Sequence, residues 1–135
     1  MGHMKTEERT ITNIVAATLG YEQWLSRHTR IVINDLRLKH ERMRESPFVF
    51  LRATFYRWLQ LWPKLCPREA DAHGVLSVGD VPTENFGTWR DAEGRLAWGI
   101  NDVDEACVLP YTNDLVRHAA SVLFAIRERW LAISD

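Results

Sequence analysis

The spacing of apolar residues changes midway along the chain, and this change limits the possible folds more than any other feature. Up to Trp62 the apolar residues recur every three or four positions, as they do on one face of an α-helix. This spacing predicts a helix over about residues 6–25, interrupted by Gly20, and a second helix over about residues 30–44.

A third helix is predicted directly afterwards. Ser46 is a favourable N-cap residue, and Pro47 suits the first helical position because it has no N–H to leave unpaired. Pro63 is expected to end this helix. Its expected buried face consists of Phe48, Leu51, Phe55, Leu59 and Trp62.

Beyond this point the pattern is typical of short strands. Residues 65–74 show no period and are expected to form a loop, and residues 75–78 a short strand. Residues 86–90 and 95–100 read as the two strands of a hairpin, with Gly94 in a left-handed turn position between them.

The chain is expected to close with a helix that Thr112 caps. The sequence therefore predicts an α+β fold, rich in helix, with one small antiparallel β-hairpin element. Residues 1–4 resemble the remnant of a tag, and residues 5–135 are expected to form a single domain. The expected apolar stripe of the last helix is Leu115, Ala119, Val122, Ile126 and Trp130.

Composition excludes several classes of protein. A chain of 135 residues with 46% hydrophobic residues can bury one core, and no apolar run reaches the roughly 18 residues of a membrane span. Cys66 and Cys107 are too far apart in sequence for a CxxC zinc site, and the expected location is the cytoplasm. The formal net charge of −1 gives no overall basic field for nucleic acid, and the six tryptophans are expected mainly in the core.

The small net charge hides two segments of opposite sign. Residues 27–45 contain six basic and three acidic residues, whereas residues 69–105 contain nine acidic residues and only Arg90 and Arg95 as bases. Such a segment is either a solvated face or a region that binds cations.

The acidic segment also contains the one arrangement that suggests chemistry. Asp80 follows the predicted strand, Asn85 comes five residues later, and the hairpin leads directly to Asp102 and Asp104. In kinase-type phosphoryl transfer a loop aspartate orients the attacking hydroxyl, and an asparagine and a second aspartate hold magnesium. The alternative is that Asp80 and Asn85 only cap turns through their side chains.

Longer motifs around these residues resemble the bacterial family called domain of unknown function 2252. The resemblance covers most of the chain from about Tyr21 onward, and the family is similar to aminoglycoside-phosphotransferase-like kinases in its GD-x-x-x-x-N loop followed by D-x-D. The matching segments are Lys39-His40-x-Arg42-Met43, Ser46-Pro47-Phe48, Phe50 to Trp58, Val78-Gly79-Asp80, Glu84 to Asp91, Asn101-Asp102-x-Asp104-Glu105-Ala106, and Pro110-Tyr111 through Asp114-Leu115-x-Arg117.

The resemblance implies part of a kinase-like phosphotransferase that uses Mg²⁺ and ATP on an unidentified small molecule. Carried over to matching positions, Asp80 is the catalytic base, Asn85 and Asp102 are metal ligands, and Asp104 is a second acidic ligand. No residue can be assigned to the nucleotide. The matching positions Lys39, Arg42 and Arg52 receive no role, and salt bridges on helix surfaces are expected there.

Two residues depart from the family pattern: Pro82 replaces a histidine and Val103 replaces a phenylalanine. The family's glycine-rich loop and nucleotide-contacting lysine also have no counterpart, so the chain resembles an N-terminal fragment or a shortened member. On its own it is expected to be inactive and to bind Mg²⁺ weakly. The alternatives are a non-catalytic interaction or scaffold domain that has lost the site, and an unrelated metal-dependent hydrolase.

A fragment of a larger fold is also expected to expose apolar surface. We expect exposed aromatic side chains around Trp58, Trp62 or Trp130, and association with a second copy through them.

Overall fold

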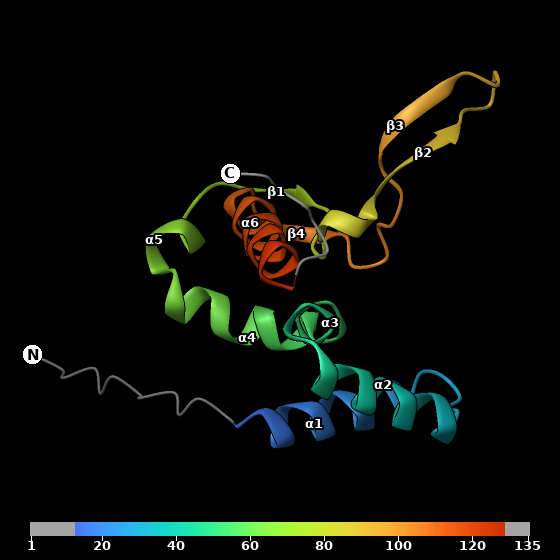
Figure 1. The fold of residues 1–135 in the computed structure, drawn as a ribbon. Coiled ribbons are helices and arrows are strands. Elements are labelled where there is room, and N and C mark those ends of the chain that lie inside the picture. Colours follow the sequence, from blue (N-terminus) through green and yellow to red (C-terminus); the bar gives the residue numbers. More distant parts are fainter. Residues whose placement is uncertain (1–12, 129–135) are drawn as a thin grey trace, which may run out of the picture. The chain divides into compact units, whose positions relative to one another are not determined.

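The computed structural model describes residues 13–128, which contain six α-helices, one 3₁₀ turn and four strands (Figure 1). The chain divides into two compact units, Met1–Ile31 and Val32–Asp135. The predicted α+β class is confirmed, although the structure has two small antiparallel sheets where one hairpin was expected, and the expected tag remnant lies outside the described residues. The first unit contains α1 (Ile14–Ser26); the second contains α2 (Ile33–Glu45), α3 (Pro47–Ala53), α4 (Phe55–Leu65), α5 (Pro67–Ala70), β1 (Gly74–Ser77), η1 (Thr83–Asn85), β2 (Phe86–Arg90), β3 (Leu96–Ile100), β4 (Cys107–Pro110) and α6 (Thr112–Arg127).

Helix α1 begins where a side chain satisfies its first free N–H groups. The side chain of Asn13 accepts a hydrogen bond from Ala16 N at 2.9 Å. The helix continues through Gly20, so the interruption expected there is wrong. A single glycine lowers the stability of a helix by only about 1 kcal/mol, which is too little to break it.

The third predicted helix is two helices. Ser46 and Pro47 start α3 as predicted, because the Ser46 hydroxyl accepts from Val49 N at 3.1 Å. The chain then breaks at Thr54, whose hydroxyl donates to Phe50 O at 2.7 Å and whose backbone leaves the helical region. Pro63 lies inside α4 rather than ending it, since α4 continues to Leu65.

The β-structure consists of two separate pairs of antiparallel strands. β2 and β3 form the predicted hairpin, with Phe86 opposite Ile100 and Arg90 opposite Leu96, and Gly94 has the expected positive φ of +78°. β1 confirms the other predicted strand, but its partner β4 is not predicted from the sequence. The expected loop over residues 65–74 also contains the short helix α5.

Helix α6 buries a face that differs from the predicted stripe. Its buried residues are Asn113, Arg117, Ser121 and Ala125, whereas Leu115 is 63% exposed. Thr112 is the first helical residue and not a side-chain cap; its hydroxyl donates instead to Glu69 O at 2.5 Å. The expected position of Trp130 lies outside the described residues.

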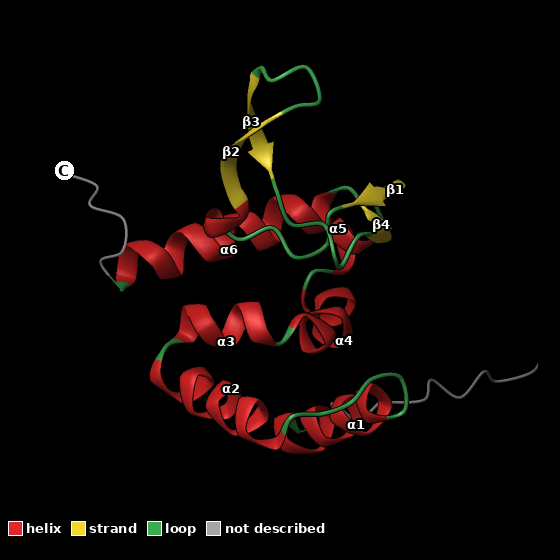
Figure 2. Cartoon of the chain, turned by 90° about the vertical axis from the view of Figure 1, so that its right-hand side faces the viewer, coloured by secondary structure: helices red, strands yellow, loops and turns green. Residues whose placement is uncertain are grey.

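Helix α6 lies along α3, as Figure 2 shows, and the two are joined at one end. The carboxylate of Glu128, just after α6, accepts hydrogen bonds from Phe48 N at 3.0 Å and from the Ser46 hydroxyl. This acid satisfies one free N–H group at the start of α3, and its negative charge interacts favourably with the positive end of the helix dipole.

The apolar core of the second unit is small. Phe48, Phe55 and Trp62 are buried, so the expected exposure of Trp62 is wrong. Among the described residues of this unit, the exposed tryptophans lie instead on the hairpin, where Trp98 is 68% exposed and stacks on Phe86. In the described residues no helix is both long and apolar enough to cross a membrane.

Candidate active site

Helix α6 holds the loop between β1 and η1 through side chains that bind its backbone. The carboxylate of Asp114 accepts hydrogen bonds from Val78 N at 2.8 Å and Gly79 N at 3.1 Å. Further along, the hydroxyl of Ser121 accepts from Thr83 N at 3.1 Å. Because a loop outside a sheet must find partners for its backbone groups elsewhere, the face of α6 toward this loop carries polar side chains, of which Ser121 is fully buried, in place of an apolar stripe.

Asp80 lies between these two attachments and is bound by a buried arginine. Arg117 of α6 is 0% exposed, and its Nε donates to Asp80 Oδ1 at 2.6 Å. Its Nη2 donates to Leu51 O at 2.7 Å, and the guanidinium lies 5.0 Å from the ring centre of Phe55 and 5.1 Å from that of Trp58. Arg117 therefore fixes one oxygen of Asp80 against α3 and α4.

The environment shifts the pKa of both partners. Burial raises the pKa of Asp80, while Arg117 and then Arg52 act in the opposite direction. Burial lowers the pKa of the Arg117 guanidinium, whose ordinary value is so high that it stays protonated at neutral pH. The carboxyl of Asp80 thus ionises less readily than a surface aspartate, and the paired arginine is what keeps the charged form accessible.

A close approach of two backbones brings the second acidic segment beside Asp80. Gly79 has a φ of +87°, and a Cβ at this position would lie 2.5 Å from the carbonyl oxygen of Glu105. Only glycine fits such a contact without a shift of the backbone. The loop of residues 101–106 is in this way packed against the loop that carries Asp80.

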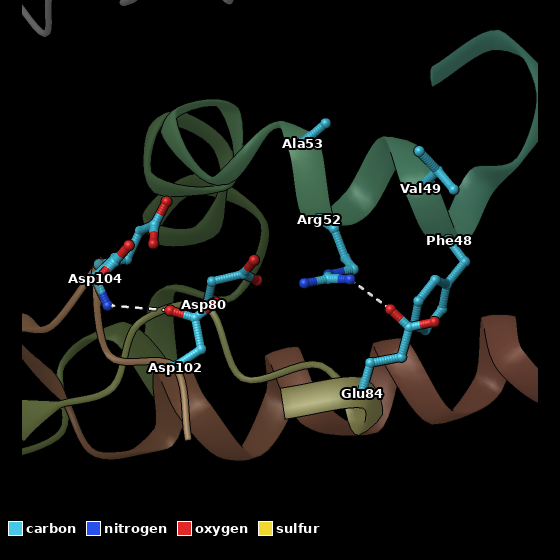
Figure 3. Close-up of a pocket in the computed structure, with 9 residues that line it drawn as sticks. Phe48, Val49, Arg52, Ala53, Asp80, Glu84, Asp102 and Asp104 are labelled. Atoms are coloured by element: carbon cyan, nitrogen blue, oxygen red, sulfur yellow. Dashed lines mark hydrogen bonds and ion pairs between the residues drawn. The ribbon is translucent and has the colours of Figure 1, made fainter. Parts of the chain in front are cut away.

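An open cavity of about 430 Å³ lies between α3, the loop that carries Asp80 and the loop of residues 101–106. Figure 3 shows Asp80, Asp102 and Asp104 on one side of it, facing Arg52 of α3 and Glu84. We call Asp80, Asp102, Asp104 and Glu105 the acidic cluster. Burial raises the pKa of Glu105, and repulsion from Asp80, Asp102 and Asp104 raises it further, which places the four carboxylates within electrostatic reach of one another.

Asn85, the other predicted metal ligand, does not line this cavity. It is 4% exposed, its Nδ2 donates to Asp80 O at 3.0 Å, and its Oδ1 accepts from Arg52 Nη2 at 3.3 Å. Arg52 also forms an ion pair with Glu84 through Nη1. Asn85 thus supports the Asp80 loop, and its oxygen already has a donor.

The acidic cluster has the donor chemistry of a magnesium site but not the form of a closed cage. Carboxylate oxygens suit Mg²⁺, which keeps several waters and takes one or two carboxylates from a protein. Among the described residues, no three His, Cys, Asp or Glu side chains converge closely enough to enclose an ion. An ion at this cluster would therefore keep several of its water ligands.

Several residues of the site are not predicted from the sequence. Arg117 and Glu105 occur in the motifs, yet nothing in their spacing predicts an ion pair with Asp80 or a place at the cavity. A usable signal was the row of polar residues Asn113, Arg117 and Ser121, four apart in a helical segment, because such a row marks a buried polar face. Arg52 pairs with Glu84 across the fold, unlike Arg42, which pairs with Glu45 on its own helix at 3.7 Å as expected.

Comparison with known proteins gives one match. The model of a family described as uncharacterized proteins conserved in bacteria, domain of unknown function 2252, matches residues 30–134. No curated protein matches the chain, and no solved structure does. The matched range includes α3, the Asp80 loop, the acidic cluster and α6.

Proposed function

Because the chain belongs to that bacterial family, domain of unknown function 2252, we propose that its matched region forms part of a magnesium- and ATP-dependent phosphotransferase that acts on a hydroxyl group of a small molecule. Asp80 is the catalytic base in this proposal. Asp102 and Asp104 hold the metal ion, and Asn85 belongs to the same loop as in the kinase pattern.

One observation carries the proposal: Asp80 lines the same cavity as Asp102 and Asp104 while Arg117 fixes its Oδ1. Among the described residues the other oxygen, Oδ2, accepts no hydrogen bond. A carboxylate held in this way has one oxygen left to accept the proton of a hydroxyl. ATP, when bound, would supply the phosphoryl group, and Mg²⁺ would neutralise part of its negative charge.

The two departures from the family pattern leave this cavity open. Pro82 is fully buried in the loop, and its carbonyl accepts from Asn85 N at 3.0 Å, which forms the turn η1. Val103 is 55% exposed. Neither residue lines the cavity, so neither blocks the approach of a hydroxyl to Asp80.

The test is a magnesium titration followed by thermal unfolding. We expect Mg²⁺ to raise the melting temperature, with a dissociation constant on the order of millimolar because few protein ligands are available. A Mg²⁺ concentration about a hundredfold above that constant adds about 2.7 kcal/mol to the free energy of unfolding. Asp102→Asn removes the effect, whereas Asp71→Asn, an equal change of charge outside the cavity, keeps it. Equal shifts in all three proteins would refute the metal site.

A second candidate is a non-catalytic interaction domain, and the hairpin favours it. Both faces of the two-stranded β2–β3 sheet carry an exposed tryptophan, Trp89 at 42% and Trp98 at 68%. A two-stranded sheet gains little stability alone, and such side chains are typical of surfaces that bind a partner. Sedimentation of the wild-type chain and of Trp98→Ser tests it: association that the substitution removes, without any response to Mg²⁺, supports this candidate over the first.

A further inference from the structure

Arg52 is the one cation among the described residues that line the acidic cavity. Its side chain extends from α3 into the space between Asp80 and Glu84, as Figure 3 shows. Its side chain is 36% exposed, so it is neither a buried structural arginine like Arg117 nor a freely solvated one. The pairing expected for it, with a neighbour on its own helix, does not occur.

The bonds of Arg52 leave part of its guanidinium unsatisfied. Nη1 pairs with Glu84 and Nη2 makes a long hydrogen bond of 3.3 Å to Asn85 Oδ1. Nε is buried and donates to no acceptor in the described part of the chain. An arginine with a buried, unused N–H gains from an acceptor that offers two oxygens spaced to match two of its N–H groups, as carboxylates and phosphates do.

Arg52 would also oppose the binding of a metal ion at the acidic cluster. A guanidinium beside these carboxylates lowers their attraction for a cation. Pairing of Arg52 with an anion would therefore favour the metal ion, because the anion neutralises that positive charge.

On the basis of the function proposed above, we propose that Arg52 is an anion-binding residue that exchanges its bonds to Asn85 and Glu84 for a polyphosphate group, the chemical class to which the nucleotide tail belongs. The polyphosphate is favoured over other anions because it must lie next to the metal ion, and Arg52 borders the acidic cluster that would hold that ion. Binding of the anion and of the metal ion then help each other through one side chain.

The experiment measures two ligands separately on three proteins. Wild type, Arg52→Gln and Arg52→Lys are titrated with MgCl₂ alone and, in chelator, with inorganic tripolyphosphate alone, by calorimetry. We expect Arg52→Gln to bind tripolyphosphate about tenfold more weakly, because it loses charge-assisted hydrogen bonds. The same variant should bind Mg²⁺ about fivefold more tightly, because a competing charge is gone. Arg52→Lys retains part of the tripolyphosphate affinity, since it keeps the charge but loses the planar fork.

Opposite changes for the two ligands separate this role from a structural one. Arg42→Gln, which removes an equal charge from the exposed face of α2, should change neither affinity. If Arg52→Gln weakens both ligands, or leaves tripolyphosphate binding unchanged, the proposal is overturned. If Arg52→Gln does not fold, Arg52→Lys decides: it should bind tripolyphosphate more weakly than wild type and Mg²⁺ equally well, because it loses the planar fork but keeps the charge, and unchanged tripolyphosphate binding would overturn the proposal. A wild-type chain that binds tripolyphosphate through Arg52 but no Mg²⁺ would refute the proposed function and retain the anion site.

Discussion

Replacement of Arg117 by methionine should destabilise the protein more than any other substitution of a charged residue in α6. Arg117 is 0% exposed and the side chain of Asp80 is 12% exposed, so the substitution leaves a buried carboxylate without its partner. Breaking a buried pair from one side costs about 3–5 kcal/mol. Against a total stability of about 5–15 kcal/mol for a domain, this is a large fraction.

Arg57 offers a matched control for this substitution. It is also a buried arginine, 9% exposed, but its hydrogen-bond partner among the described residues is the neutral Gln60, to which Nη1 donates at 2.9 Å. Arg57→Met leaves no buried charge unpaired and should cost about 1 kcal/mol. The difference between the two variants therefore contains the loss of the partner of Asp80, which the double-mutant cycle below separates from the other contacts of Arg117.

The assay is urea unfolding at neutral pH, followed by tryptophan fluorescence and circular dichroism. A double-mutant cycle with Asp80→Asn gives the coupling energy, which we expect to be about 2 kcal/mol or more because the groups are in direct contact. Two results would refute this reasoning: an Arg117→Met variant no less stable than Arg57→Met, or effects of Arg117→Met and Asp80→Asn that simply add.

Two further predictions concern the loops around the cavity. Gly79→Ala should lower the free energy of unfolding by about 2 kcal/mol or more, because φ at Gly79 is positive and a Cβ there would lie 2.5 Å from Glu105 O. In the same urea assay Gly94→Ala should cost only about 1 kcal/mol, because φ at Gly94 is positive but the space around it is open. Equal costs for the two variants would contradict the close approach of the two loops. Glu105→Gln should raise the melting temperature at neutral pH, because the raised pKa of Glu105 means that its ionised form destabilises the native state. That gain should disappear at about pH 3, below the ordinary value, where Glu105 is protonated in both states; a gain independent of pH would contradict the repulsion.

Local features of the fold were predictable from the sequence, and features that depend on distant partners were not. The start of α3 at Ser46 and Pro47 and the turn at Gly94 depend on residues within a few positions of each other. The pairing of β1 with β4 joins Gly74 to Pro110, and no local signal marks that partner. The break at Thr54 depends on one hydroxyl that binds Phe50 O, an option that spacing alone does not reveal.

The same distinction applies to the candidate site. Asp80, Asp102 and Asp104 were identified by motif, and the structure brings all three to one cavity. The two arginines beside these acids come from distant parts of the sequence. Arg117 of α6 binds Asp80, and Arg52 of α3 lines the same cavity. The apolar periodicity predicted the wrong buried face for α6. The side chains of α6 bind the backbone of a loop, so the helix buries polar residues and leaves residues such as Leu115 exposed.

Anomalous diffraction can show whether the acidic cluster holds a divalent ion beside Asp80. Mn²⁺ takes the same oxygen ligands as Mg²⁺ and scatters anomalously, so crystals of the chain soaked in Mn²⁺ locate the ion without any assumption about substrate. We predict an anomalous peak in the cavity, bonded to a carboxylate oxygen of Asp102 and facing Asp80. A map with no peak there at saturating Mn²⁺, or with peaks only at exposed hairpin acids such as Glu93, would contradict the account.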